Sequence, residues 1–141
     1  MSTPIFYAIL SAFFAALTAI LAKIGIKNVD SDLAVGIRTL VVVIFAWGIV
    51  FFRGVWREMP LLSGKTVTFL ILSGLATGAS WLFYFKAIQM GNVSQVAPVD
   101  KLSIALTILL AFFILGESPD MKTLLGGGLI TAGVLVIALL P

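Results

Sequence analysis

The sequence predicts an all-α membrane protein with five transmembrane helices. Hydrophobic residues make up 61% of its 141 residues and charged residues only 11%, a balance far more apolar than in soluble domains. Apolar stretches long enough to cross the roughly 30 Å hydrocarbon core as helices recur along the chain. They cover residues 4–26, 33–52, 66–88, 93–116 and 121–140. The connections between these stretches are too short to contain a soluble domain.

The composition excludes most kinds of chemistry. The chain has no cysteine and no histidine, which removes disulfides, thiol nucleophiles, the imidazole base and the usual zinc ligands. We therefore predict no catalytic residue, no metal, no cofactor and no enzyme activity. The net charge is +3, but the basic residues flank apolar spans, so the expected partner is the lipid bilayer and not a nucleic acid.

The first two spans carry small residues and a few basic ones. Lys23 at the end of the first span is interpreted as an anchor whose stem lies in lipid and whose ammonium reaches the interface. Arg38 follows about two turns into the second span, and Lys86 lies near the end of the third. Alanines spaced by three or four residues mark one face of the first span, which suits close helix packing: Ala8, Ala12, Ala15, Ala16, Ala19 and Ala22.

The third span combines a packing face with a polar aromatic face. Gly74 and Gly78 have the spacing of a close helix contact, whereas Thr77, Trp81 and Tyr84 fall together on a neighbouring face. Aromatic rings can hold the apolar body of a ligand while hydroxyl groups orient it. The alternative is an ordinary helix interface with an aromatic belt, and the sequence leaves both interpretations open.

The fourth span contains the most unusual residues, Pro98, Asp100 and Lys101. Ionisable side chains at membrane depth indicate a functional site, and a proline frees a backbone carbonyl and favours a kink. Ser103 and Thr107 extend the polar stripe of Asp100. Lys101 either pairs with Asp100 or another helix and snorkels, or contacts a solute or coupling ion. Adjacent helical residues point about 100° apart, so the pattern does not decide whether these two pair.

A tight turn separates the last two spans. Ser118, Pro119 and Asp120 are predicted to begin the fifth span as N-cap, first-turn proline and first-turn acid, respectively. Glu117 is interpreted as a boundary residue near the positive end of that helix. The fifth span then has a glycine-dense face at residues 126–128 that suits a close helix contact, either within the chain or with a second subunit.

The basic residues are nearly balanced between the two sides of the membrane. Alternate spans place Lys23, Lys27, Arg38, Lys86 and Lys101 near one side, and Arg53, Arg57, Lys65 and Lys122 near the other. Such a small bias does not fix one orientation. A shift of 63 positions also aligns Lys23 with Lys86 and Arg38 with Lys101, a weak internal repeat. We therefore expect the chain to insert both ways and to form an antiparallel homodimer.

Several short motifs together resemble a known family. They are Ile37-Arg38-Thr39, Tyr84-Phe85-Lys86-Ala87, the run from Gly91 to Pro98, Leu115-Gly116-Glu117 and the glycine-rich last span. The chain resembles a single EamA-type domain of the drug/metabolite transporter superfamily over essentially its whole length. The resemblance implies a five-helix half-transporter unit that a second subunit of inverted orientation completes.

The resemblance implies a multi-pass transporter of the cell inner (cytoplasmic) membrane that moves a small polar or amphipathic metabolite by alternating access. Small multidrug exporters of this superfamily carry a glutamate in the first helix, and this first span has none, which argues against proton-coupled export of organic cations. The alternatives are a component of a lipid-linked flippase and a non-transporting membrane partner subunit. The predicted substrate pathway comprises Lys101, Asp100, Pro98, Trp81, Tyr84, Thr77, Ser103, Thr107, Arg38 and Lys86.

Overall fold

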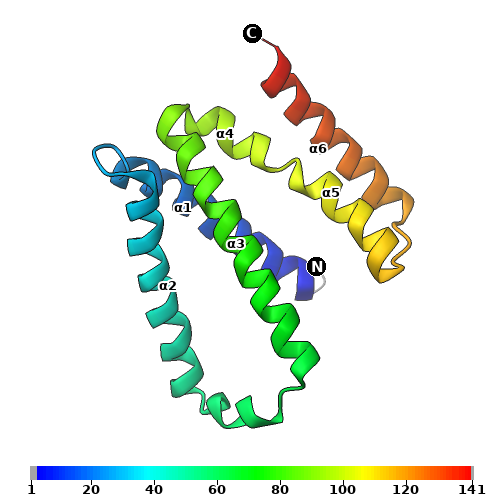
Figure 1. Cartoon of the computed structure of the whole chain (residues 1–141). Helices are drawn as coiled ribbons and strands as arrows, with labels where there is room; N and C mark the ends of the chain where they lie inside the picture. Colours follow the sequence, from blue (N-terminus) through cyan, green and yellow to red (C-terminus); the bar gives the residue numbers. More distant parts are fainter. Residues whose placement is uncertain (1–2, 141) are drawn as a thin grey trace. The chain divides into compact units, whose positions relative to one another are not determined.

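The structure is a computed structural model that describes residues 3–140, and within that range it is helical with no strand. Its helices include five segments long and apolar enough to cross a membrane, which confirms the predicted fold class (Figure 1). Four of them are the helices α1 (Thr3–Gly25), α2 (Ser31–Phe52), α3 (Gly64–Met90) and α6 (Met121–Leu139). The remaining span, Val93–Leu115, is built from three consecutive helical pieces.

Contacts divide the chain into two units. One unit consists of residues 21–89 and the other of the residues before and after that range. The central unit holds the end of α1, all of α2 and most of α3. The terminal unit holds most of α1 together with the fourth and fifth spans.

The central unit is organised by a small contact between α2 and α3. Asp30 caps α2, because its carboxylate accepts hydrogen bonds from the backbone amides of Asp32 (2.9 Å) and Leu33 (3.3 Å). The two helices lie close together near the start of α2 and diverge toward the short 3-10 helix η1 (Val55–Leu61) that connects them. Val35 on α2 and Phe85 on α3 are buried where the two helices meet.

Polar contacts join the turn after α1 to the end of α3. The Lys23 ammonium donates a hydrogen bond to the carbonyl oxygen of Ile88. Ser31, the first residue of α2, is buried. The Gln89 amide nitrogen donates to the carbonyl oxygen of Val29 at 2.8 Å and to that of Ile26 at 3.5 Å. Lys23 therefore binds protein in addition to the interfacial role predicted for it. These bonds satisfy carbonyl groups that helix ends leave without partners.

The fourth span is interrupted where the sequence predicted one helix with a possible kink. It consists of α4 (Val93–Asp100), α5 (Ser103–Leu110) and the π-helix η2 (Ala111–Leu115). Pro98 has no N–H to donate to the carbonyl one turn earlier, which weakens the ladder at this point. The amides of Lys101 and Leu102 bond three residues back, to the carbonyls of Pro98 (2.9 Å) and Val99 (3.0 Å). The α-helical bonding is therefore interrupted by a tighter turn at residues 101–102, whose backbone angles remain right-handed.

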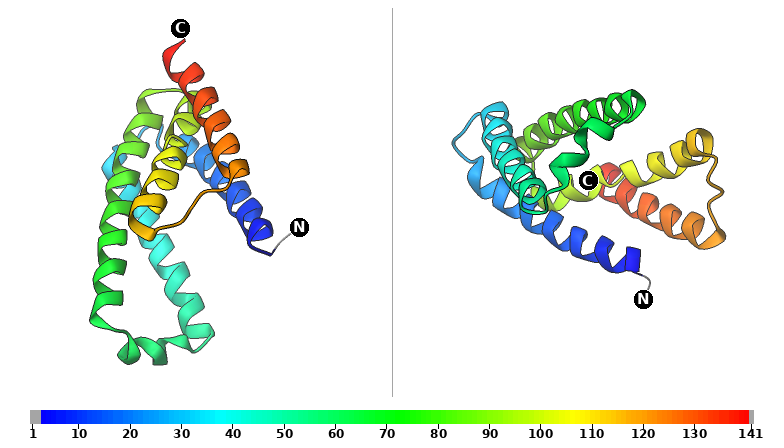
Figure 2. Two further views of the ribbon diagram at one scale, coloured as in Figure 1. Left: turned by 90° about the vertical axis from the view of Figure 1, so that its right-hand side faces the viewer. Right: turned by 90° about the horizontal axis from the view of Figure 1, so that it is seen from below.

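An antiparallel hairpin joins α5 to α6 (Figure 2). Gly116 ends η2 in the left-handed region with φ of +69°, a conformation that favours glycine. Asp120, and not the predicted Ser118, is the N-cap of α6, because its carboxylate accepts the Thr123 amide at 2.8 Å. Pro119 consequently precedes the cap and is not the first helical residue. Gly127 is buried on α6, and a Cβ built there would lie only 2.6 Å from Cδ1 of Ile108.

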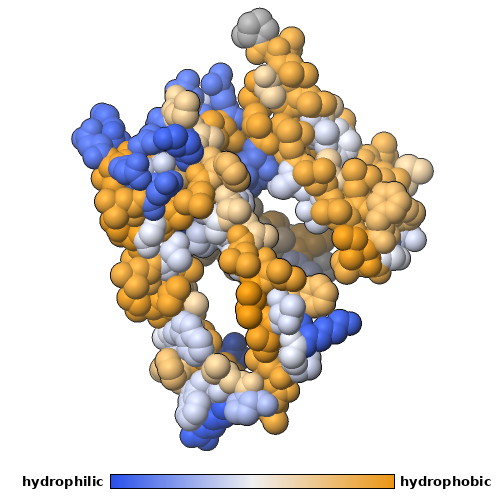
Figure 3. Space-filling model, in the orientation of Figure 1, coloured by the Kyte–Doolittle hydropathy of each residue, from blue (hydrophilic) through white to orange (hydrophobic). Residues whose placement is uncertain are grey.

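The surface of the helices is mostly apolar. Within the central unit, hydrophilic residues gather at the two ends and leave apolar surface between them (Figure 3). No more than 11% of the most apolar window of any span is buried. Such exposure is expected for helices whose solvent is lipid, because lipid chains solvate apolar side chains as well as a protein core does.

Candidate functional site

The ten residues predicted to line a pathway are distributed over both units. Arg38, Thr77, Trp81, Tyr84 and Lys86 belong to the central unit. The other five lie on α4 and α5 in the terminal unit, namely Pro98, Asp100, Lys101, Ser103 and Thr107. Each group is therefore described within its own unit.

The structure pairs Asp100 with Lys101 at the break of the fourth span. The Lys101 ammonium lies 3.2 Å from a carboxylate oxygen of Asp100, and Pro98 is half-buried one turn before them. Neighbouring residues of a regular helix point apart, so the long Lys101 side chain must bend back to reach the carboxylate. The side chains of Lys101 and Asp100 are 52% and 38% exposed, respectively. An ion pair this open contributes at most about 1 kcal/mol to stability. The pair leaves both charges accessible to a solute.

Arg38 is held against aromatic rings in the central unit. Its guanidinium carbon lies 4.2 Å from the centre of the Trp81 ring and 5.5 Å from that of Phe85. The face of α2 that contains Ser31 and Val35 continues one turn further to Arg38, because residues 31, 35 and 38 are spaced by four and three. The sequence predicted Arg38 and Trp81 as separate pathway residues, and the structure brings these two together.

The other predicted residues of the central unit have more ordinary surroundings. The Thr77 hydroxyl donates to the carbonyl of Ser73 at 2.9 Å, within its own helix. Tyr84 is half-buried and packs against the small core around Phe85. Lys86 is exposed on α3. Among these three residues, only Tyr84 packs with Trp81 around the same core.

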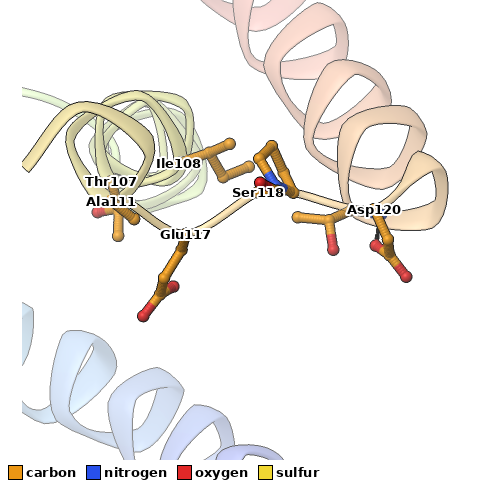
Figure 4. Close-up of a pocket in the computed structure, with 8 residues that line it drawn as sticks. Thr107, Ile108, Ala111, Glu117, Ser118 and Asp120 are labelled. Atoms are coloured by element: carbon orange, nitrogen blue, oxygen red, sulfur yellow. Dashed lines mark hydrogen bonds between the residues drawn. The ribbon is translucent and has the colours of Figure 1, made fainter. Parts of the chain in front are cut away.

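A cavity of about 400 Å³ lies at the α5–α6 hairpin (Figure 4). Thr107 lines it together with Glu117, Ser118, Asp120 and Thr123, whereas Ser103 lies one turn earlier and is exposed. The carboxylates of Glu117 and Asp120 do not point toward each other. Hydrogen bonds from the Thr123 side chain and backbone amide lower the pKa of Asp120. Asp120 therefore acts as a helix cap in this cavity.

Metal coordination has no support within residues 3–140. No group of three or more acidic side chains that could hold an ion occurs in that range.

Two contributions were missed from the sequence. Phe85 is the second ring beside Arg38, and Gln89 ties α3 to the turn after α1. The spacing of residues 81, 85 and 88 on one helical face was the available signal for Phe85. Gln89 had no signal, because its partners are backbone carbonyls that only the fold brings near.

Comparisons with known proteins identify similar sequences. The model of the EamA-like transporter family matches residues 2–139. The chain is also similar to a Sinorhizobium sp. protein described as an uncharacterized transporter in the cobO 3' region, with 47% identity over 133 residues that cover 94% of each chain. No solved structure matches the chain significantly.

Proposed function

The chain belongs to the EamA-like transporter family, and on that premise we propose that it carries a small polar or amphipathic metabolite across the cell inner membrane. The family points to a membrane transporter rather than an enzyme. The five apolar helices make it a multi-pass membrane protein. The proposal adds to this the class of solute, the mechanism and the assembly.

The interrupted fourth span is the observation that carries the proposal. The interruption at Lys101–Leu102 places a charged pair within a segment of membrane-spanning length, and Pro98 offers no N–H to the carbonyl one turn earlier. A backbone acceptor freed at membrane depth is tolerated where it is buried in protein or lines a water-filled cavity. Transporters commonly use such discontinuous helices to form solute sites near the middle of the bilayer. Asp100 and Lys101 would then set the polarity of the pathway.

A second copy of the chain would complete that pathway. One chain leaves Lys101 and Asp100 substantially exposed, and charges facing lipid are costly. On α6, added Cβ atoms at Gly126 and Gly133 would meet nothing within 4 Å, and these two positions, seven residues apart, share a helix face that has space for another helix. An inverted copy would give the two opposed halves on which alternating access depends. We therefore propose an antiparallel homodimer.

Uptake into proteoliposomes tests the role of Lys101. A solute is first selected by thermal-shift screening of a metabolite panel against the purified protein, and its uptake is then compared among Lys101→Ala, Lys101→Arg and Lys122→Ala. Loss of the ammonium is expected to lower initial uptake by about tenfold or more, because one charge-assisted contact is worth roughly 1.5–3 kcal/mol. Lys101→Arg is expected to retain part of it.

Lys122 is the matched control, because it is an exposed lysine in the first turn of α6. Its replacement is expected to leave uptake unchanged. Wild-type uptake by both Lys101 variants, with normal yield and gel-filtration behaviour, would remove Lys101 from the pathway. No uptake of any compound that binds the wild-type protein would instead contradict transport itself.

A further inference from the structure

We propose that Arg38 binds an oxyanion group of the transported solute and that Trp81 holds the guanidinium in position for it. This inference rests on the proposed transport function, and it adds a substrate class, namely metabolites that carry a carboxylate or phosphate. It also assigns separate roles to two residues of the predicted pathway. The argument depends only on contacts inside the central unit.

The aromatic rings restrict Arg38 from one side. The guanidinium carbon is 4.2 Å from the centre of the Trp81 ring, which is within cation–π distance, and Phe85 lies 5.5 Å away. Arg38 is half-buried, and Phe85 is only 3% exposed. Phe85 belongs to the small core of the unit and Trp81 packs against that core, so both rings are held by packing. The side chain is therefore more restricted than a free surface arginine.

The hydrogen-bond donors of Arg38 have no acceptor among the residues of the central unit. Arg38 donates no hydrogen bond to any residue between 21 and 89 and forms no ion pair with one. A guanidinium has five N–H donors around its edge, and contact with a ring face leaves that edge open. The central unit thus supplies an attractive surface for the cation but no anion to neutralise it.

The position of Arg38 makes this unpaired edge significant. It lies seven residues after the start of α2, or about 10 Å along the helix axis. Unsatisfied donors and unpaired charges are costly at such depth, so water or a ligand must occupy them. A guanidinium forms paired hydrogen bonds with carboxylate and phosphate oxygens, whereas it repels amines. The chemistry of the edge therefore selects oxyanions.

A second arginine provides an internal comparison. Arg57 lies 5.6 Å from the ring of its neighbour Trp56, but both belong to η1, outside the spans. The pair resembles Arg38 and Trp81 in composition, yet both partners come from adjacent residues of an exposed connection. Replacement of Arg57 should therefore disturb an arginine–tryptophan contact without touching the proposed binding group.

Fluorescence of Trp81 provides the direct test. Trp47 and Trp56 are replaced by phenylalanine in the full chain, which leaves Trp81 as the reporter. The purified protein in neutral detergent is titrated at constant ionic strength with glutamate, succinate, inorganic phosphate, acetamide, ethylamine and phosphatidylglycerol. We expect a saturable change with at least one soluble oxyanion and none with acetamide or ethylamine. Comparing the responses to glutamate and succinate with the response to phosphate shows whether the site prefers a carboxylate or a phosphate.

Variants then assign the response to Arg38. Arg38→Gln is expected to weaken the apparent Kd by at least about tenfold, because a charge-assisted pair is lost. Arg38→Lys keeps the charge but loses the planar edge, so an intermediate Kd is expected. Arg57→Lys, made in the otherwise unaltered chain so that Trp56 is present, is expected to bind like the parent. Thermal-shift titration of the otherwise unaltered chain repeats the comparison without the tryptophan replacements and covers the case in which these impair folding.

Several results would overturn the inference. They are no response to any soluble oxyanion in both assays, equal responses in the parent and in folded Arg38→Gln, and a response confined to phosphatidylglycerol. Uptake assays separate this failure from failure of the proposed function. Transport that does not depend on Arg38 would refute the inference and leave the proposed transport function intact. Oxyanion binding at Arg38 without any uptake would contradict the transport function and leave the binding role of Arg38 intact.

Discussion

The contact between Gly127 and Ile108 gives a sharp prediction about packing in the terminal unit. A Cβ at position 127 would lie 2.6 Å from Cδ1 of Ile108, whereas the preferred separation of carbon atoms is about 3.5–4.0 Å. Gly127→Ala must therefore displace the end of the Ile108 side chain by about 1 Å. That end can rotate, so the cost should lie in the lower part of the range for overpacking, about 1–2 kcal/mol.

The matched control is Gly48→Ala on α2, because a Cβ there meets nothing within 4 Å. Alanine favours a helix over glycine by about 1 kcal/mol, so the control should gain about that amount. The same gain partly offsets the clash at Gly127, and Gly127→Ala should end between about 0 and 1 kcal/mol less stable than the parent. The two variants should thus differ by about 1–2 kcal/mol.

Unfolding in mixed micelles, followed by circular dichroism as the fraction of denaturing detergent rises, measures these free energies. Ile108→Val removes Cδ1, so in that background Gly127→Ala should stabilise the protein as Gly48→Ala does. A double-mutant cycle should yield a coupling of about 1 kcal/mol or more between positions 108 and 127. Equal effects of alanine at 48 and 127, with no coupling to Ile108, would refute the proposed packing of α5 on α6.

Three further predictions concern separate parts of the molecule. Gln89→Leu removes the bond to the Val29 carbonyl and should lower the free energy of unfolding by about 0.5–1.5 kcal/mol, whereas Gln95→Leu on the exposed part of α4 should change it less in the same assay. The pKa of Asp120 is lowered in the folded protein, so its stabilising contribution is present above the unfolded pKa and is lost as pH falls through the folded value. Asp120→Ala should therefore destabilise the protein near neutral pH, and the difference from wild type should shrink as the solution becomes acidic; a constant difference would contradict the assigned cap. In phosphate-free buffer, added succinate should leave the Trp81 fluorescence of the Arg38→Gln variant unchanged. A change as large as that of the protein with Arg38 intact would contradict the role given to Arg38.

The helices were predictable from composition and spacing. The five apolar runs become helices because a spanning segment must satisfy its own backbone hydrogen bonds, and this requirement does not depend on tertiary detail. The weak point at Pro98 was also predictable. Its consequence was not, because the break falls at Lys101–Leu102, where bonds from Lys101 and Leu102 reach back only three residues. Asp100 and Lys101 pair beside this point.

The side-chain contacts were harder to predict. Arg38 and Trp81 were each recognisable as unusual residues in a span, but their contact depends on how α2 packs on α3. The N-cap of α6 illustrates a different difficulty. Ser118 and Asp120 are both good capping residues, and only the backbone geometry shows that Asp120 accepts the Thr123 amide. If a second copy completes the pathway, its contacts lie between two chains, and the spacing of residues along one chain does not predict such contacts.

The orientation of the chain in the membrane tests the central claim most directly. Ser63 bonds to Thr66 at the start of α3, so Leu61, which is 82% exposed in η1, is the better place for a single cysteine in a chain that has none. Membranes containing Leu61→Cys are treated with an impermeant maleimide before and after the other face is opened. An inverted homodimer predicts substantial labelling from each side, in roughly equal shares because the flanking charges are nearly balanced. Labelling from one side alone would contradict an antiparallel pair of identical chains.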